Sequence, residues 1–129
     1  MSFDMFVLRY VAGEPAPLDR DVLDEVLGPY VAARDPAVDL LQLRVGERGG
    51  ADVWLRETSL TLNHVAGQGA LDLVCALLRR LGAVLALPGG TVVLYRDEDR
   101  ERLPPELRDA AVLVVATTGA ELGRAIRES

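Results

Sequence analysis

Residues Ser59 to Gly82 read SLTLNHVAGQGALDLVCALLRRLG, and this stretch decides the fold of the chain. Leu60 to His64 alternates apolar and polar side chains, which is the period of a half-buried strand. Gly67-Gln68-Gly69 interrupts the pattern, because glycine accepts backbone angles that are closed to other residues. From Ala70 onward the apolar residues recur at helical spacing, and Gly82 stands where an αL cap would end the helix. The stretch therefore predicts a strand, a glycine turn and an amphipathic helix.

A polar corner lies where this strand gives way to the helix. A helix start carries unpaired N–H groups and a partial positive charge, and a glycine turn lets a ligand approach the backbone. One hypothesis is therefore a site for a small molecule or an anion, with His64 as acid, base or hydrogen-bond donor. Its candidate ligand-binding residues are Asn63, His64, Gly67, Gln68 and Gly69. The alternative is a turn in which Asn63 and His64 only satisfy backbone groups of the loop.

Specific catalytic and cofactor motifs are missing from the sequence. Gly67-x-Gly69 is a poor dinucleotide fingerprint, because Asp72 stands at the third glycine position and would repel a pyrophosphate. One histidine and one cysteine are too few for a tetrahedral zinc site, and the absence of lysine excludes Schiff-base chemistry. A Ser-His-Asp catalytic arrangement would need a serine in hydrogen-bond contact with His64. Ser59 lies five residues before His64 on the predicted strand, too far along an extended chain for such a bond. We expect no metal and no cofactor, and the missing motifs argue against an enzyme.

The composition bounds the class of protein. At 129 residues with 50% hydrophobic residues, the chain is expected to form a single domain, residues 1–129, with its own core. The formal net charge is -6, and the arginines are scattered along the chain, so we expect no nucleic-acid binding. An acidic surface suits a basic protein partner instead.

The single cysteine and the N-terminus bear on the compartment. One cysteine cannot form an internal disulfide, which fits a reducing environment, and Cys75 is expected to be a packed thiol. The opening segment carries Asp4 and has no basic region of the kind that begins a signal peptide. No apolar run approaches the roughly 20 residues that cross a bilayer. We expect a cytoplasmic protein that does not enter a membrane.

Periodicity along the rest of the chain predicts the remaining elements. Strands are expected at residues 3–10, 38–45, 51–57, 84–87, 91–95 and 111–116, and further helices from Asp19 and from Thr118. Residues 3–10 are apolar on both alternating faces, so this strand is expected in the centre of its sheet with cover on both sides. The apolar run at 111–116 is likewise expected to be a buried strand.

This order of elements predicts the fold class. We expect an α+β protein: a ferredoxin-like sandwich of a mainly antiparallel sheet, with helices packed on one face and an additional C-terminal strand and helix. The alternative is a mixed sheet with helices on both faces.

A second candidate surface consists of charged and aromatic residues. The run at residues 97–102 lacks the glycine and the distal glutamate of a calcium loop and is predicted to be a solvated loop. Trp54 shares a strand face with Asp52 and Arg56, and an exposed tryptophan would indicate a contact surface. Candidate partner-binding residues are Asp97, Glu98, Asp99, Glu101 and Trp54.

The opening Met1-Ser2-Phe3-Asp4-Met5-Phe6-Val7, on a short acidic chain, resembles the start of small bacterial proteins. Some of those are similar to immunity proteins of polymorphic toxin systems, and the resemblance implies a protein that masks a basic toxin; it assigns no functional residues. We therefore expect a small protein-interaction module that binds a basic partner. The alternatives are the small-molecule site at His64, and a homodimer joined through an edge strand.

Overall fold

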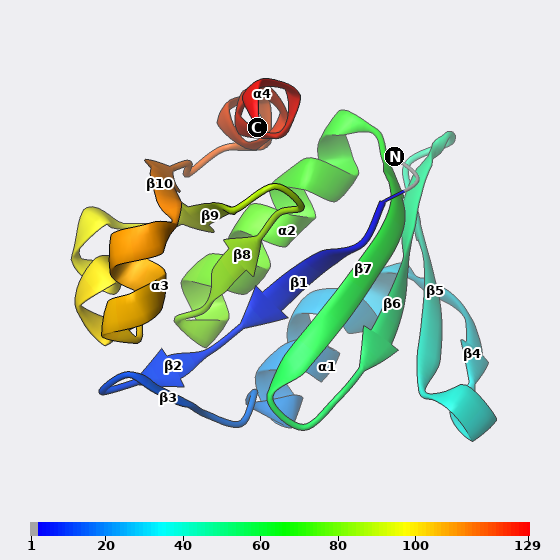
Figure 1. Ribbon diagram of the computed structural model, residues 1–129. Coiled ribbons are helices and arrows are strands. Elements are labelled where there is room, and N and C mark those ends of the chain that lie inside the picture. The colour runs from blue at the N-terminus through cyan, green and yellow to red at the C-terminus, as the bar shows by residue number, and fades with distance from the viewer. Residues whose placement is uncertain (1–2) are drawn as a thin grey trace.

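The computed structural model describes residues 3–129. The strands are β1 (Met5–Leu8), β2 (Tyr10–Val11), β3 (Glu14–Pro15), β4 (Val31–Asp35), β5 (Leu40–Val45), β6 (Gly49–Leu55), β7 (Ser59–Ala66), β8 (Val84–Ala86), β9 (Thr91–Leu94) and β10 (Val112–Val115). In the described chain, eight of them form one sheet in the order β10-β9-β8-β1-β7-β6-β5-β4 (Figure 1), and β2 and β3 form a separate hairpin. Neighbouring strands of the sheet are antiparallel, except that β10 is parallel to β9.

The helices are α1 (Arg20–Leu27), α2 (Gln68–Leu81), α3 (Pro105–Ala110) and α4 (Gly119–Glu128), with 3₁₀ turns η1 (Gly28–Tyr30), η2 (Pro36–Val38) and η3 (Asp97–Arg102). Their ends follow the signals in the sequence. The Asp19 carboxylate accepts hydrogen bonds from two backbone N–H groups at the start of α1, and the Thr118 hydroxyl accepts one from the Glu121 N–H at the start of α4. Gly82 ends α2 in the left-handed conformation with φ +65°. None of the helices in residues 3–129 has the length and apolar character needed to cross a bilayer.

The main core lies between the sheet and the helices α1, α2 and α4. Leu78 of α2, Leu62 of β7 and Val7 of β1 are almost completely buried in it. Helix α2 supplies most of the cover, because apolar residues at helical spacing turn one broad stripe of it toward the strands. Burial of this stripe, rather than helix propensity, is the main source of its stability.

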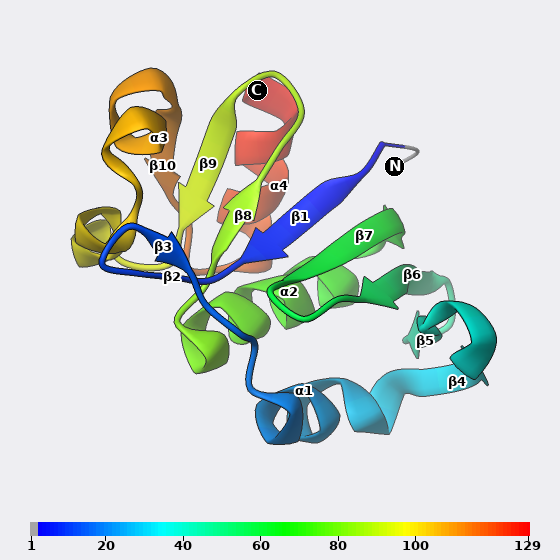
Figure 2. The ribbon, with the colours of Figure 1, turned by 60° about the horizontal axis from the view of Figure 1, so that its bottom comes forward.

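A second, smaller core lies on the opposite face, at one end of the sheet. Val84, Val92, Leu94 and Leu103 form it, and Leu107 of α3 packs against it. Figure 2 shows α1 and α2 on one side of the sheet and α3 on the other. The chain is therefore a mixed α+β protein with a mostly antiparallel sheet, as predicted. The expectation that all helices pack on one face was wrong, because Leu103 and Leu107 bring η3 and α3 across the other face.

Three further expectations are corrected by the sheet. Strand β1 is central, as predicted, but Phe6 remains 39% exposed because the second core covers only the end of this strand. The run at 111–116 forms an edge strand in which Val112 is 62% exposed, so it is not a buried strand. Strand β4 was not expected, because its sequence VAARD is mostly exposed and has no apolar alternation.

Candidate functional site

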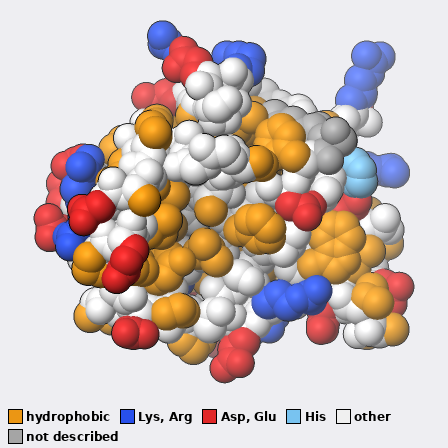
Figure 3. All heavy atoms as spheres, viewed as in Figure 1, with side chains coloured by type: hydrophobic (Ala, Val, Ile, Leu, Met, Phe, Trp, Pro, Cys, Tyr) orange, Lys and Arg blue, Asp and Glu red, His pale blue; other side chains and the backbone are white. Residues whose placement is uncertain are grey.

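One face of the sheet, over β1, β7, β6 and β5, carries no helix of the described chain (Figure 1). We call it the open face. Two rows of side chains cross it in strand register: Phe6, Thr61 and Trp54 in one row, and Asp4, Asn63, Asp52 and Gln42 in the other. Hydrophobic side chains lie across the middle of this side of the molecule, with acidic and basic side chains between and around them (Figure 3).

A shallow hollow of about 210 Å³ lies in the open face. Asp4, Trp54, Arg56 and Thr61 line it. Thr61 stands beside Trp54 in strand register, so that a short side chain lies next to the indole ring at the base of the hollow. The lining combines an indole ring, a carboxylate and a guanidinium group, which can contact a side chain that is both apolar and charged.

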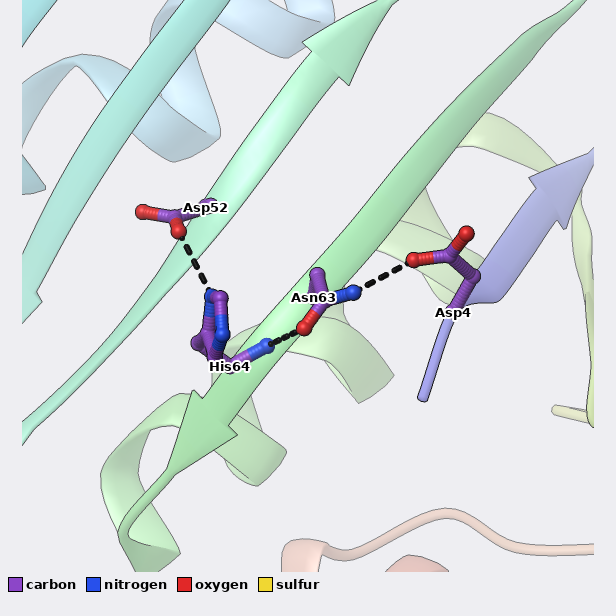
Figure 4. Close-up of polar contacts among 4 residues, drawn as sticks. All are labelled: Asp4, Asp52, Asn63 and His64. Carbon is purple, nitrogen blue, oxygen red and sulfur yellow. Dashed lines mark hydrogen bonds and ion pairs between the residues drawn. The ribbon is translucent and has the colours of Figure 1, made fainter. Parts of the chain in front are cut away.

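A chain of polar contacts borders the hollow (Figure 4). The Asn63 side-chain amide donates to the Asp4 carboxylate at 2.5 Å, and the Asn63 oxygen accepts from the His64 backbone N–H at 2.6 Å. His64 Nδ1 lies 2.8 Å from Asp52 Oδ2. The contacts join β1, β7 and β6, so they fix the position of the two carboxylates relative to the hollow.

The backbone of β7 is irregular at His64. Gly50 pairs with Ala66 and Asp52 with Asn63, so His64 and Val65 together oppose the single residue Ala51. This is a β-bulge, and His64 occupies its left-handed position with φ +53°, where glycine is the usual residue. The bulge turns the imidazole toward Asp52 on the neighbouring strand, and the strain at His64 is local to the site.

The His64–Asp52 contact determines which ring nitrogen of the imidazole carries the proton in that hydrogen bond. An ionised carboxylate can only accept, so Nδ1 donates to Asp52 and Nε2 is left to face outward. The His64 side chain is 67% exposed, and within residues 3–129 its Nε2 has no hydrogen-bond partner. The outer ring nitrogen can make a hydrogen bond to a ligand at the surface, but in the described chain no hydroxyl or thiol stands in hydrogen-bond contact with His64 as a nucleophile would.

The predicted glycines stand beside this site in a different role. A Cβ on Gly67 would lie 3.1 Å from the Gly49 Cα, and one on Gly69 would lie 2.9 Å from Val45 Cγ1. Both glycines therefore allow the start of α2 to pack closely against the β5–β6 hairpin. The five residues proposed from the sequence as a ligand site are neighbours in space, but protein atoms occupy the space beside Gly67 and Gly69. Gln68 is exposed at the first turn of α2.

Replacement of His64 tests the strain at the bulge. We expect His64→Val to lower the free energy of unfolding by about 1–2 kcal/mol, because a β-branched residue is disfavoured at positive φ. His64→Gly is expected to change it by less than about 1 kcal/mol, because relief of strain offsets the entropy of glycine and the loss of an exposed hydrogen bond to Asp52. Urea denaturation of both variants and the wild type measures this. Equal losses in the two variants would contradict the interpretation.

Most carboxylates of the second predicted surface lie within ion-pair distance of arginines of the same chain. Residues 97–102 form the 3₁₀ helix η3 rather than the loop expected, although four of them, Asp97, Glu98, Glu101 and Arg102, are exposed to solvent as predicted. Asp99 is 4% exposed and accepts a hydrogen bond from the Arg96 N–H, so it holds η3 in place. Asp97 pairs with Arg100, and Glu101 lies 3.8 Å from Arg108. Glu98 alone of these four carboxylates has no ion-pair partner in the described chain.

The predicted Trp54 lies elsewhere on the sheet. In the sheet order β8, β1 and β7 separate its strand from β9, the strand that η3 contacts. The acidic run and Trp54 therefore do not form one site.

Cys75 is a packed thiol, as its place on α2 predicted. It is 3% exposed. Burial, with a further contribution from the carboxylates of Asp72 and Glu121, raises the pKa of its thiol from 9.0 to about 11. A thiol in this environment stays protonated at neutral pH and is a poor nucleophile.

This shift predicts a loss of stability at alkaline pH. The unfolded chain releases the Cys75 proton near pH 9, whereas the folded chain holds it to about pH 11, so the stability that this group contributes is complete below pH 9 and falls as pH rises toward 11. We expect the free energy of unfolding to decline less steeply in Cys75→Ala than in the wild type over this interval. Urea denaturation at a series of pH values measures the difference, and parallel curves would contradict it.

Asp4, Phe6, Asp52, Arg56 and Thr61 were not among the residues predicted for a site. Each follows a visible signal, because polar or aromatic side chains recur at every second position of their strands. The missing information was strand pairing: β1 joins β7 only after residues distant in sequence have come together.

No group of three or more His, Cys, Asp or Glu side chains within residues 3–129 is placed to hold a metal ion. Comparison of the chain with protein-family models, with curated proteins and with solved structures finds no match.

Proposed function

We propose that this protein is a protein-interaction module that binds a basic partner protein through its open face. The observation that carries the proposal is the hollow at Thr61, with Trp54 on one side and the Asp4 carboxylate on another. Aromatic residues are the side chains that most often dominate binding energy at protein interfaces. A cationic side chain of the partner would stack on Trp54 and pair with Asp4.

Charge supports the choice of a basic partner. The chain has a formal net charge of -6, which steers a cationic protein toward it and speeds association. Asp4 and Asp52 are held on the open face by Asn63 and His64, so both carboxylates are already oriented before a partner arrives. Arg56 at the rim favours a partner that also brings a carboxylate or a backbone carbonyl to that position.

A narrower form of this proposal is an immunity protein that masks a basic toxin in the cytoplasm. Its support is the acidic charge, the small size and the resemblance of the opening segment. The buried, unpaired Cys75 is consistent with a reducing compartment.

For the fold, we propose a ferredoxin-like core. In chain order β1, α1, β6, β7, α2 and β8 follow the βαββαβ pattern, with the β2–β3 hairpin inserted before α1 and β4 and β5 inserted before β6. The four strands of that pattern are neighbours in the sheet.

Trp54 provides a direct test, because it is the only tryptophan of the chain and its fluorescence reports on the open face. We expect a synthetic peptide of alternating arginine and leucine to change the emission saturably at low salt, with weaker binding at high salt. The double variant Asp4→Asn, Asp52→Asn is expected to weaken this binding by about tenfold, through loss of two charge-assisted contacts. The matched control is Asp97→Asn, Glu98→Gln, which removes the same charge from η3 and is expected to leave binding within about twofold of the wild type.

Two results would count against the proposal. Absence of a saturable change at low salt would remove the open face as a binding surface. A loss of binding in the η3 variant, with the Asp4 and Asp52 variant unchanged, would move the site to the acidic run.

A further inference from the structure

Strand β10 ends the sheet with an edge that no strand of the described chain pairs with. Val112 N–H donates to Gly90 and Ala116 N–H donates to Leu94, so Val112, Val114 and Ala116 turn their backbone groups toward β9. Alternation along a strand then directs the N–H and C=O groups of Leu113 and Val115 away from β9, toward the free edge. Leu113 and Val115 therefore each present a backbone N–H donor and a C=O acceptor along the free edge.

The two edges of the sheet differ in protection. Strand β4, at the other end, contains a bulge and two consecutive charged residues, Arg34 and Asp35. Pro36 follows it directly. These are the features by which edge strands avoid pairing with other chains. Strand β10 has the sequence VLVV without charge or proline, and Val112 and Val115 are 62% and 41% exposed.

A groove of about 240 Å³ runs between this edge and α4. Val114 and Ala125 give it an apolar floor, Val115 borders it at the end of β10, and Glu121, Arg124 and Glu128 form its α4 wall. The wall carries both signs of charge, with Arg124 and Glu128 paired at 3.1 Å. A surface with both signs can face a second copy of itself without like charges alone meeting across the interface.

We propose that the free edge of β10 binds a second copy of this chain, antiparallel, about a two-fold axis at Val114. In that register Leu113 pairs with Val115 of the second copy and Val115 with its Leu113, and each pair exchanges two hydrogen bonds. Val114 meets its own counterpart in the groove beside α4. Leu113 and Val115 lie on the opposite face of the strand, where each packs across the pair on the other. The dimer uses a surface distinct from the open face, so it leaves the proposed partner site free.

The test uses proline and threonine at the same position. Val115→Pro removes an N–H that points to the free edge and places ring atoms there, without removing a hydrogen bond to β9. We expect it to raise the dimer dissociation constant by about 100-fold in sedimentation equilibrium, because each copy loses a hydrogen bond and leaves a carbonyl unpaired. Val115→Thr keeps the N–H and the branched shape, and it is expected to dimerise within about threefold of the wild type.

Amide hydrogen exchange of the wild type gives a readout that does not depend on the proline variant folding. We expect the Leu113 and Val115 amides to exchange more slowly as protein concentration rises, while exposed loop amides such as that of Gly89 do not change. A wild-type protein that sediments as a monomer at every accessible concentration would overturn the proposal. So would a dimer in which the Leu113 and Val115 amides exchange equally fast at low and high concentration, or one that Val115→Pro leaves intact.

Discussion

Replacement of Leu78 by alanine is expected to lower the free energy of unfolding by about 3 kcal/mol. Leu78 is fully buried near the C-terminal end of α2, where it packs into the main core between this helix and the sheet. Removal of its side chain loses the transfer free energy of the buried carbons and leaves a cavity, because the strands on the other side are fixed by their hydrogen bonds and cannot move in to fill it. Urea denaturation measures the loss.

Leu40→Ala is the matched control. Leu40 is a partly exposed leucine of β5, paired with Trp54. The same change there is expected to cost about 1 kcal/mol or less, because less apolar surface returns to water and solvent fills the space. Similar losses in the two variants would show that α2 is not the main cover of the core.

Gly50→Ala is expected to have the next largest effect, a loss of about 2–3 kcal/mol. A Cβ at Gly50 would lie 2.3 Å from the Leu43 carbonyl oxygen. Strand β6 pairs with β5 on one side and β7 on the other, so neither strand can move away without loss of ladder hydrogen bonds. Thermal and urea denaturation of the variant measure the effect.

Gly28→Ala separates this clash from a general effect of removing glycine. Gly28 has helical angles with φ -49°, and apart from its two neighbours in the chain a Cβ there meets nothing within 4 Å. Pro29 disfavours helical angles at a preceding residue that has a Cβ, whereas the unfolded chain loses freedom with alanine, so the two effects oppose each other and Gly28→Ala is expected to change the free energy of unfolding by about 1 kcal/mol or less. Destabilisation of similar size at both positions would mean that the close approach at Gly50 is not the cause.

Local signals predicted most of the elements of this chain. Each of these elements follows from the periodicity or the cap chemistry of residues close to it in sequence. Examples are helix α2, its αL cap at Gly82, the cap at Asp19 and the strand that contains His64. Strand β4 could not be predicted in this way. Its side chains are exposed, and only the pairing of its backbone with β5 makes it a strand.

The candidate site, too, could be predicted only in part from the sequence. The sequence pointed to His64, Asn63 and Trp54, which do lie on the open face or at its border. It could not show that Asp4 and Asp52 flank them, because each of those contacts joins residues on different strands. Nor could it show the bulge at His64, since the pattern of apolar residues through β7 is that of a regular strand as far as Asn63. The acidic run was misread because one buried carboxylate, Asp99, makes it helical.

The central position of β1 has a consequence for how the chain acquires its structure. Met5 pairs with Leu62 and Phe6 with Ala86, so β1 is synthesised before either of its two neighbours in the sheet. Ordering of such distant partners costs loop-closure entropy before any contact rewards it, which slows folding relative to a helical protein of the same size. During synthesis β1 therefore lacks both partners until β7 has emerged, and its second edge remains unpaired until the segment that ends at Ala86 has emerged.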